Sequence, residues 1–165
     1  MFVTRNDAKA QKNGPHSTIY WVKQQKKFED GSFKGEKWRA SSKYTGSWHD
    51  NQKSGFGIQV YENGDKYEGG WNQGKREGQG TLWVQDEKKN LRRRYTGDWI
   101  NDKKEGRGTM FYDNEDRYDG FWSQNKPCGE GRMIYKNGDV YVGSWDNGKR
   151  SGYGVLTKYS ELMQA

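Results

Sequence analysis

The chain has 165 residues, which is enough for one domain or one short solenoid but not for two full domains. Hydrophobic residues make up only 30% and charged residues 31%, a balance that by itself would suggest disorder. Aromatic residues, however, make up 15%, and the 23 glycines recur at fixed positions, so we expect a thin β-architecture rather than a thick apolar core.

Signals for membranes or secretion are not apparent. No apolar run approaches the roughly eighteen residues of a membrane-spanning helix. The first residues lack the apolar stretch of a signal peptide, and the single cysteine, Cys128, cannot form an internal disulfide. We therefore expect a cytoplasmic protein in a reducing compartment.

Residues 1–43 carry most of the excess charge. They contain ten Lys or Arg and four acidic residues, a net charge of +6 out of +7 for the chain. Within them, residues 28–35 resemble a degenerate turn followed by an aromatic-x-Gly strand. We expect this basic N-terminal segment to hold an imperfect hairpin that caps the sheet, because a terminal strand otherwise leaves an unpaired edge.

A repeat occupies residues 44–157. The pattern Tyr-x-Gly-x-Trp occurs five times, with tyrosines 23, 28, 23 and 23 residues apart, and Gly-x-Gly begins seven residues after each Trp. The repeat residues are Tyr44, Gly46, Trp48, Tyr67, Gly69, Trp71, Tyr95, Gly97, Trp99, Tyr118, Gly120, Trp122, Tyr141, Gly143 and Trp145. Because side chains alternate along a strand, the three repeat residues of each unit share one face.

Each repeat predicts a β-hairpin. One strand runs from Gly-x-Gly into an apolar stretch, a turn such as Asn63-Gly64-Asp65 follows, and Tyr-x-Gly-x-Trp forms the second strand. We therefore predict an all-β fold, an elongated and solenoid-like single-layer antiparallel sheet of about five hairpins, with residues 158–165 as a tail that starts a short helix near Ser160. The sequence is compatible with a two-residue turn and with a three-residue turn that includes a bulge. These two turns set different registers, so they place different residues of the first strand beside each tyrosine.

The pattern over residues 44–157 resembles the MORN (membrane occupation and recognition nexus) repeat family. The resemblance implies a non-catalytic scaffold or adaptor that binds other proteins, and the family's name implies contact with anionic lipid. Short motifs at residues 8–14, 92–95 and 131–139 are similar to a flagellar member of the family. That similarity implies a structural protein of the cytoskeleton in a cilium or flagellum, in the axoneme or its assembly.

No constellation for chemistry stands out. His16 and His49 lack the oriented partner that a general base needs, and Cys and His do not cluster as zinc requires. The Gly-x-Gly pairs lack the third glycine and the following helix of a dinucleotide fingerprint. We expect no enzymatic activity, no cofactor and no metal. Nucleic-acid binding is disfavoured because residues 44–165 carry a net charge of only +1.

Two irregular features are candidate partner sites. Phe121 stands where the other repeats have small or polar residues, and alternation turns it away from Trp122, where an exposed aromatic ring suggests an interface. The longer third spacing makes residues 86–94 a basic hairpin tip, for which a solvated loop is the alternative. The candidate binding residues of this tip are Lys88, Lys89, Arg92, Arg93 and Arg94.

The aromatic rows and the basic residues that follow them each have two interpretations. The Tyr and Trp rows form the core of a thin sheet, or part of them lines a groove for a peptide. Four or five residues after the Trp residues come basic residues: Lys53, Lys75, Arg76, Lys103, Lys104, Lys126, Lys149 and Arg150. They form a solvated edge, or they bind anionic phospholipids in a peripheral membrane protein, although acidic residues on the same edge weaken the field.

Overall fold

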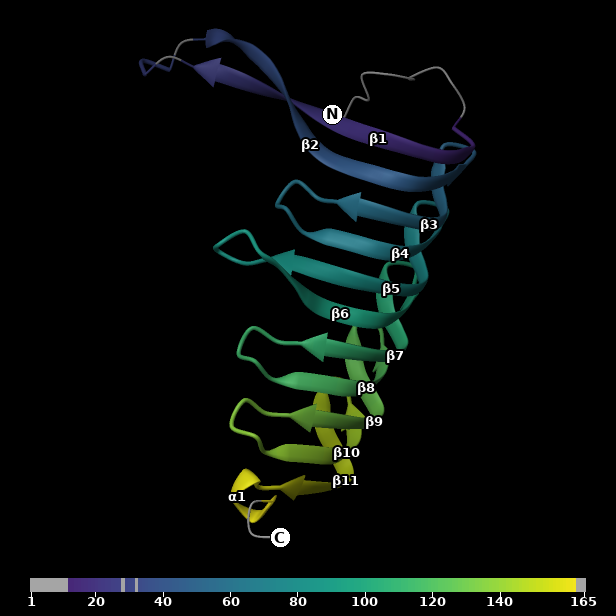
Figure 1. Ribbon diagram of the computed structural model, residues 1–165, viewed down its shortest axis with the longest axis vertical. Coiled ribbons are helices and arrows are strands. Elements are labelled where there is room, and N and C mark those ends of the chain that lie inside the picture. The colour runs from purple at the N-terminus through teal and green to yellow at the C-terminus, as the bar shows by residue number, and fades with distance from the viewer. Residues whose placement is uncertain (1–11, 28, 32, 163–165) are drawn as a thin grey trace.

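The computed structural model describes residues 12–27, 29–31 and 33–162 as one open antiparallel sheet in which every strand pairs with its neighbours in chain order (Figure 1). The strands are β1 (Gly14–Lys27), β2 (Phe33–His49), β3 (Gln52–Val60), β4 (Lys66–Asn72), β5 (Lys75–Gln85), β6 (Leu91–Ile100), β7 (Lys103–Phe111), β8 (Arg117–Ser123), β9 (Lys126–Ile134), β10 (Val140–Asp146) and β11 (Lys149–Thr157). The short helix α1 (Tyr159–Leu162) follows. The predicted all-β, single-layer sheet of tandem hairpins is confirmed.

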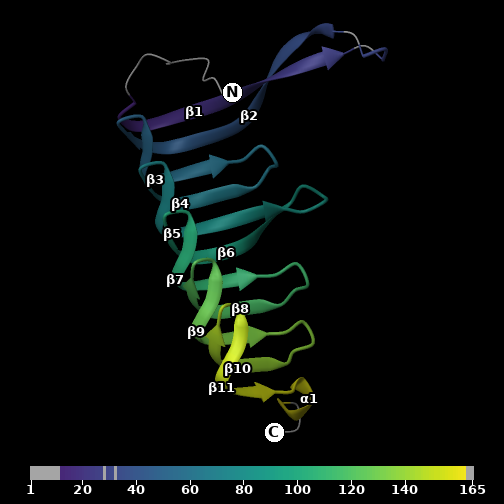
Figure 2. The ribbon, with the colours of Figure 1, turned by 180° about the vertical axis from the view of Figure 1, so that it is seen from behind.

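The molecule is elongated, and its strands are bent. Figures 1 and 2 show the hairpin tips projecting on one side, while the strand ends that carry the inter-hairpin turns fold behind the labelled strands on the other. Each bent strand therefore has a long arm toward the hairpin tip and a short arm toward the inter-hairpin turn. No helix among the described residues is long and apolar enough to cross a membrane.

The first glycine of each Gly-x-Gly pair produces the bend. Gly55 has a φ of 62°, and the equivalent glycines of the later repeats also lie in the left-handed region. Between the pairs Gly46–Gly57 and Trp48–Lys53, one residue of β2 faces three of β3. Such a bulge bends a strand, and glycine adopts the required φ without a steric penalty.

The second glycine of each pair has a different role, because a tyrosine ring lies across it. A Cβ added to Gly108 would stand 2.2 Å from the Tyr95 hydroxyl oxygen. Gly97, directly opposite Gly108, is equally confined, since its Cβ would stand 2.5 Å from the Gly108 Cα. The two facing glycines thus form a seat on which the tyrosine ring rests.

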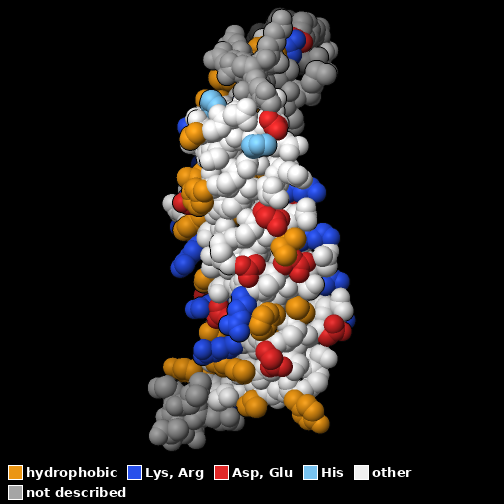
Figure 3. Space-filling view, turned by 90° about the vertical axis from the view of Figure 1, so that its right-hand side faces the viewer, with side chains coloured by type: hydrophobic (Ala, Val, Ile, Leu, Met, Phe, Trp, Pro, Cys, Tyr) orange, Lys and Arg blue, Asp and Glu red, His pale blue; other side chains and the backbone are white. Residues whose placement is uncertain are grey.

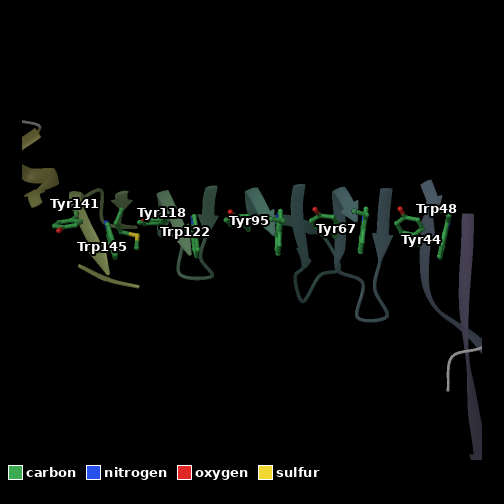
Figure 4. Packing of buried hydrophobic residues seen from close by; sticks show 11 residues of the cluster. Tyr44, Trp48, Tyr67, Tyr95, Tyr118, Trp122, Tyr141 and Trp145 are labelled. Atoms are coloured by element: carbon green, nitrogen blue, oxygen red, sulfur yellow. The ribbon is translucent and has the colours of Figure 1, made fainter. Parts of the chain in front are cut away.

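The seated tyrosines interlock with tryptophans from two repeats (Figure 4). Tyr67 meets Trp71 of its own repeat and Trp99 of the next edge to face, at centroid distances of 5.1 and 5.4 Å. The Tyr67 hydroxyl donates to the Gly70 carbonyl, and Trp99 Nε1 donates to the Gly80 carbonyl, so both polar atoms are satisfied. The tryptophan hydrogen bond recurs at Trp71, Trp122 and Trp145 but not at Trp48, and the tyrosines and tryptophans of all five repeats are buried.

Hairpin loops of three residues fix the register that the sequence left open. Tyr61 donates to the Asp65 carbonyl across the loop, and Gly64 has a φ of 89°. Gln59 therefore lies opposite Tyr67. The loop carboxylate also ties one hairpin tip to the next, because Asp65 accepts the backbone N–H of Gln85 at 2.9 Å.

A strand, β1, precedes the first repeat. Strand β1 pairs along β2, and Gly14 lies opposite Trp48 with a φ of 76°, in the role of a first glycine. Strand β2 runs without a break through the expected boundary at residue 43, since it holds both the N-terminal segment and the first Tyr-x-Gly-x-Trp. The described residues do not include the ends of the two expected terminal segments, residues 1–11 and 163–165. The first part of the motif at residues 8–14 therefore also lies outside them.

We expect Gly108→Ala to destabilise the protein by about 1–3 kcal/mol, because the new methyl group overlaps the Tyr95 ring. Urea unfolding measures the cost. Tyr95→Leu removes the hydroxyl end of the ring that the methyl group meets, so Gly108→Ala should cost clearly less in that background. Equal costs in the two backgrounds would show that the tyrosine seat is not what requires the glycine.

Candidate binding faces

The bent sheet presents two chemically different faces. We call the face that bears the repeat tyrosines and tryptophans the inner face, because side chains of the short arms reach over its rings. Arg76, on a short arm, lies 5.6 Å from the Tyr67 ring centroid and 4.1 Å from that of Trp99. The opposite side of the same strands is the outer face.

Cations cap the rings of the inner face. The residue five positions after Trp pairs with it across the strands, and in four repeats this residue is basic: Lys53, Arg76, Lys104 and Arg150. Lys53 lies 4.6 Å from the Trp71 ring and Lys104 lies 4.7 Å from the Trp122 ring, within range of cation–π attraction. Pro127 takes the equivalent place in the fourth repeat.

The basic residues that were predicted to share one solvated edge therefore divide into two sets. Lys75, Lys103, Lys126 and Lys149 are exposed at the inter-hairpin turns. Lys75 donates to Asn101 and Lys126 to Asn147, each in the following turn. The second set is Lys53, Arg76, Lys104 and Arg150, which cap the rings. The sequence did not predict this role, because the spacing from Trp does not show on which side of a bulged strand each charge lies.

Burial under the caps shifts the pKa of several groups. Desolvation lowers the pKa of Lys53 to about 8 and also lowers that of Lys104. Burial raises the pKa of Tyr44 to about 12 and raises those of Tyr67 and Tyr95 further. The inner face is therefore a desolvated surface whose groups are already engaged with one another.

The basic hairpin tip is more constrained than a solvated loop. Arg92 and Arg94 both form ion pairs with Asp113 of the next tip, and Arg94 Nη2 lies 2.7 Å from an Asp113 oxygen. Arg93 lies 5.1 Å from the Phe111 ring. Lys88 and Lys89 are exposed in the turn itself. The arginines thus join two hairpins, and a partner contact at this tip stays a prediction.

Phe121 lies where alternation placed it. It is on the outer face with 37% of its surface exposed, whereas its neighbour Trp122 is buried on the inner face. It pairs with Arg107 and Cys128 on the adjacent strands, and the Arg107 guanidinium lies 4.8 Å from its ring centroid. Aromatic residues and arginine are both enriched at protein interfaces.

Phe121 also lines a hollow of about 620 Å³ that crosses the outer face. Its lining residues are Gln79, Thr96, Gly97, Arg107, Gly108, Thr109, Asp119, Gly120, Phe121, Glu130, Gly131, Arg132 and Val142. Figure 3 shows the side of the molecule on which the strands bend, where hydrophobic side chains lie among acidic and basic ones in the lower half. Arg132 and Val142 were not predicted as site residues, because only the pairing across strands brings them beside Phe121.

Among the described residues, the titratable side chains show no cluster of metal ligands. No group of three or more His, Cys, Asp and Glu side chains there is placed to hold a metal ion. His49 lies beside Asp50 at an exposed turn. Cys128 is half-buried, and burial raises the pKa of its thiol, which disfavours the reactive thiolate. The distinctive features of both faces are contact surfaces.

The Lys53 cap has a measurable effect on stability. Its folded pKa of about 8 lies below the ordinary 10.5, so the unfolded chain binds the extra proton between those values and stability rises with pH in that window. We expect the wild-type protein to gain stability relative to Lys53→Met between about pH 7 and about pH 9.5. Urea unfolding at both pH values tests this, and a difference that does not change with pH would contradict the buried cap.

Comparison with known families agrees with this architecture. The model of the MORN repeat matches residues 44–66, 67–86, 95–117, 118–140 and 141–161, which is more than half of the chain. Each matched segment begins at the tyrosine of a Tyr-x-Gly-x-Trp strand. No curated protein matches the chain. With five consecutive matches and the corresponding hairpins in the sheet, the chain belongs to the MORN repeat family.

Proposed function

We propose that this chain is a non-catalytic scaffold or adaptor that binds another protein through the outer face around Phe121. MORN repeats in general bind proteins or membranes, and their proteins are generally non-catalytic. The observation that carries the proposal is the exposed Phe121 beside a hollow, at a position occupied elsewhere by Ser47, Gly70, Asp98 and Ser144. A scaffold distinguishes its partners through such departures from its repeat.

The state of the two faces supports the outer one. On the inner face the tyrosine and tryptophan rings are buried, lie against glycines and are capped by cations. Removal of one of these rings therefore destabilises the fold before it can affect a binding surface alone. On the outer face Phe121 and Val142 are exposed, and no strand of the described sheet covers them. A partner can therefore bury this apolar surface without disturbing the contacts that hold the sheet together.

A ciliary or flagellar location is a further part of the proposal. The motifs at residues 8–14, 92–95 and 131–139 resemble MORN repeat-containing protein 3, which is the support for a place in the cytoskeleton of a cilium or in axoneme assembly. The exposed Lys88 and Lys89 at the tip of the β5–β6 hairpin are additional candidates for contact within such an assembly. Imaging of the tagged chain in ciliated cells tests the location independently of the interface.

One observation favours a second candidate, a peripheral membrane protein. Lys75, Lys103, Lys126 and Lys149 are exposed at successive turns along one edge of the sheet. A basic row of this kind attracts anionic phospholipids, with about 1 kcal/mol for each lysine close to the surface. The same turns carry Glu77, Asp102, Glu105 and Asp146, which reduce the field of the lysines.

We expect Phe121→Ala to reduce capture of the partner from a ciliated-cell extract at least tenfold while the melting temperature stays unchanged, because loss of an interface aromatic costs about 2 kcal/mol or more. Quantitative pull-down beside thermal melting measures both effects. Phe56→Ala is the matched control, since Phe56 is an exposed aromatic residue near the bend of β3 and outside the hollow. Replacement of Arg92, Arg93 and Arg94 by Ser tests the basic tip in the same assay.

Two results would overturn the assignment to Phe121. Retention of every partner by Phe121→Ala would place the interface elsewhere on the chain. The second result concerns a triple variant, Lys75→Gln, Lys103→Gln and Lys126→Gln. If this variant no longer binds phosphatidylserine vesicles, and if every protein partner is captured only together with vesicles, the membrane candidate is favoured. Trp99→Ala serves as the unfolding reference, because it removes a buried ring shared by two repeats.

A further inference from the structure

We infer that the hollow on the outer face binds an extended peptide segment of a partner that carries two carboxylates three positions apart with apolar side chains between them, and that the carboxylates bind Arg107 and Arg132. This inference rests on the proposed function and names the kind of partner that the Phe121 face fits. Its evidence is the length of the hollow, the pairing of the charges around it and the apolar side chains on its two walls.

The dimensions of the hollow suit an extended chain. Its lining runs from Gln79 on β5 to Val142 on β10, which spans six adjacent strands. Five spacings of about 4.8 Å give a length of about 24 Å, or about seven to eight residues of an extended peptide in the polyproline II conformation at about 3.1 Å each. The backbone of Gly97, Gly108, Gly120 and Gly131 forms the floor along this line. A segment of this length lies across the strands and along the axis of the array.

The acidic residues of the hollow are already engaged. Asp119 accepts a hydrogen bond from Thr109 at 2.6 Å and forms an ion pair with Arg117 at 3.0 Å. Glu130 accepts a hydrogen bond from Ser144 at 2.7 Å. Asp119 is therefore paired with a cation, whereas Glu130 keeps its negative charge, because the donor from Ser144 is neutral.

The two arginines of the hollow are not engaged in this way. Among the described residues, neither Arg107 nor Arg132 forms an ion pair with a carboxylate, although both are exposed. Arg107 is stacked on Phe121, which orients its guanidinium while leaving the donors at its edge available. An exposed guanidinium with free donors binds a carboxylate in a bidentate manner. Because Asp119 is paired with Arg117, the two arginines outnumber the single remaining carboxylate, Glu130, and the hollow keeps a net positive charge.

The placement of the arginines specifies the spacing in the ligand. Arg107 is on β7 and Arg132 is on β9, so about 10 Å separates their strands. Three residues of a peptide in the polyproline II conformation rise about 9 Å and complete one turn, so side chains three positions apart point to the same side. Phe121 stands beside Arg107 and Val142 beside Arg132 on the neighbouring strands, and Val142 is 50% exposed. The fitting segment therefore carries carboxylates three positions apart, with apolar side chains between them to cover Phe121 and Val142.

The test uses the full chain and a fluorescein-labelled seven-residue peptide of Asp and Leu with Asp at the second and fifth positions. We expect saturable binding by fluorescence anisotropy, at least tenfold weaker for the same peptide with Asn in place of Asp. Arg132→Gln should weaken the Asp peptide at least tenfold and leave the weak Asn peptide unchanged. Lys149→Gln, which removes an exposed charge outside the hollow, should leave both unchanged.

Absence of saturable binding of the Asp peptide, equal binding of the Asp and Asn peptides, or an equal loss in Arg132→Gln and Lys149→Gln would each overturn the inference. The last result would mean that charge attracts the peptide without a site. The proposed function has a separate readout in protein capture that depends on Phe121. If that capture persists while the Asp peptide fails to bind, only the class of ligand is wrong.

Discussion

The structure depends on one interaction, the insertion of each tyrosine ring between a tryptophan of its own repeat and a tryptophan of the next. Tyr95, for example, meets Trp99 and Trp122 edge to face at 5.1 and 5.3 Å. Each such pair contributes about 0.5–1.5 kcal/mol beyond the burial of its surface. Because the contact crosses the repeat boundary, it couples neighbouring hairpins that could not bury their rings alone. The facing glycines follow from it, since Gly97 and Gly108 must leave room for the ring.

This arrangement gives the two faces of one thin sheet different tasks. The inner face holds the rings and the cations that cover them, and it repeats with little change because a substitution there disturbs two repeats. The residues of the outer face do not hold neighbouring repeats together through ring contacts. They differ from repeat to repeat, as Phe121 and Asp98 show at equivalent positions. Stability and recognition are therefore separated across the thickness of a single layer.

Much of the fold could be predicted from the spacing of the repeats. The hairpins, the face shared by Tyr67 and Trp71, and the outward direction of Phe121 all follow from alternation along a strand. The bend could not be predicted from the spacing, because a pattern of period two does not reveal the bulge at Gly55. The position of Arg76 over the inner face was therefore not predicted. The engagement of Arg92 and Arg94 was missed for another reason: Asp113 belongs to the next hairpin, and only the stacking of tips brings it near.

A double-mutant cycle on Tyr67 and Trp99 tests the central claim most directly, since these rings belong to different repeats and meet at 5.4 Å. The free energy of unfolding is measured in urea for the wild-type protein, Tyr67→Leu, Trp99→Leu and the double variant. The interlock predicts a coupling energy of about 0.5–1.5 kcal/mol, so that the double variant loses less than the sum of the single losses. Additive losses would contradict it and would mean that the rings stabilise the sheet only by separate burial.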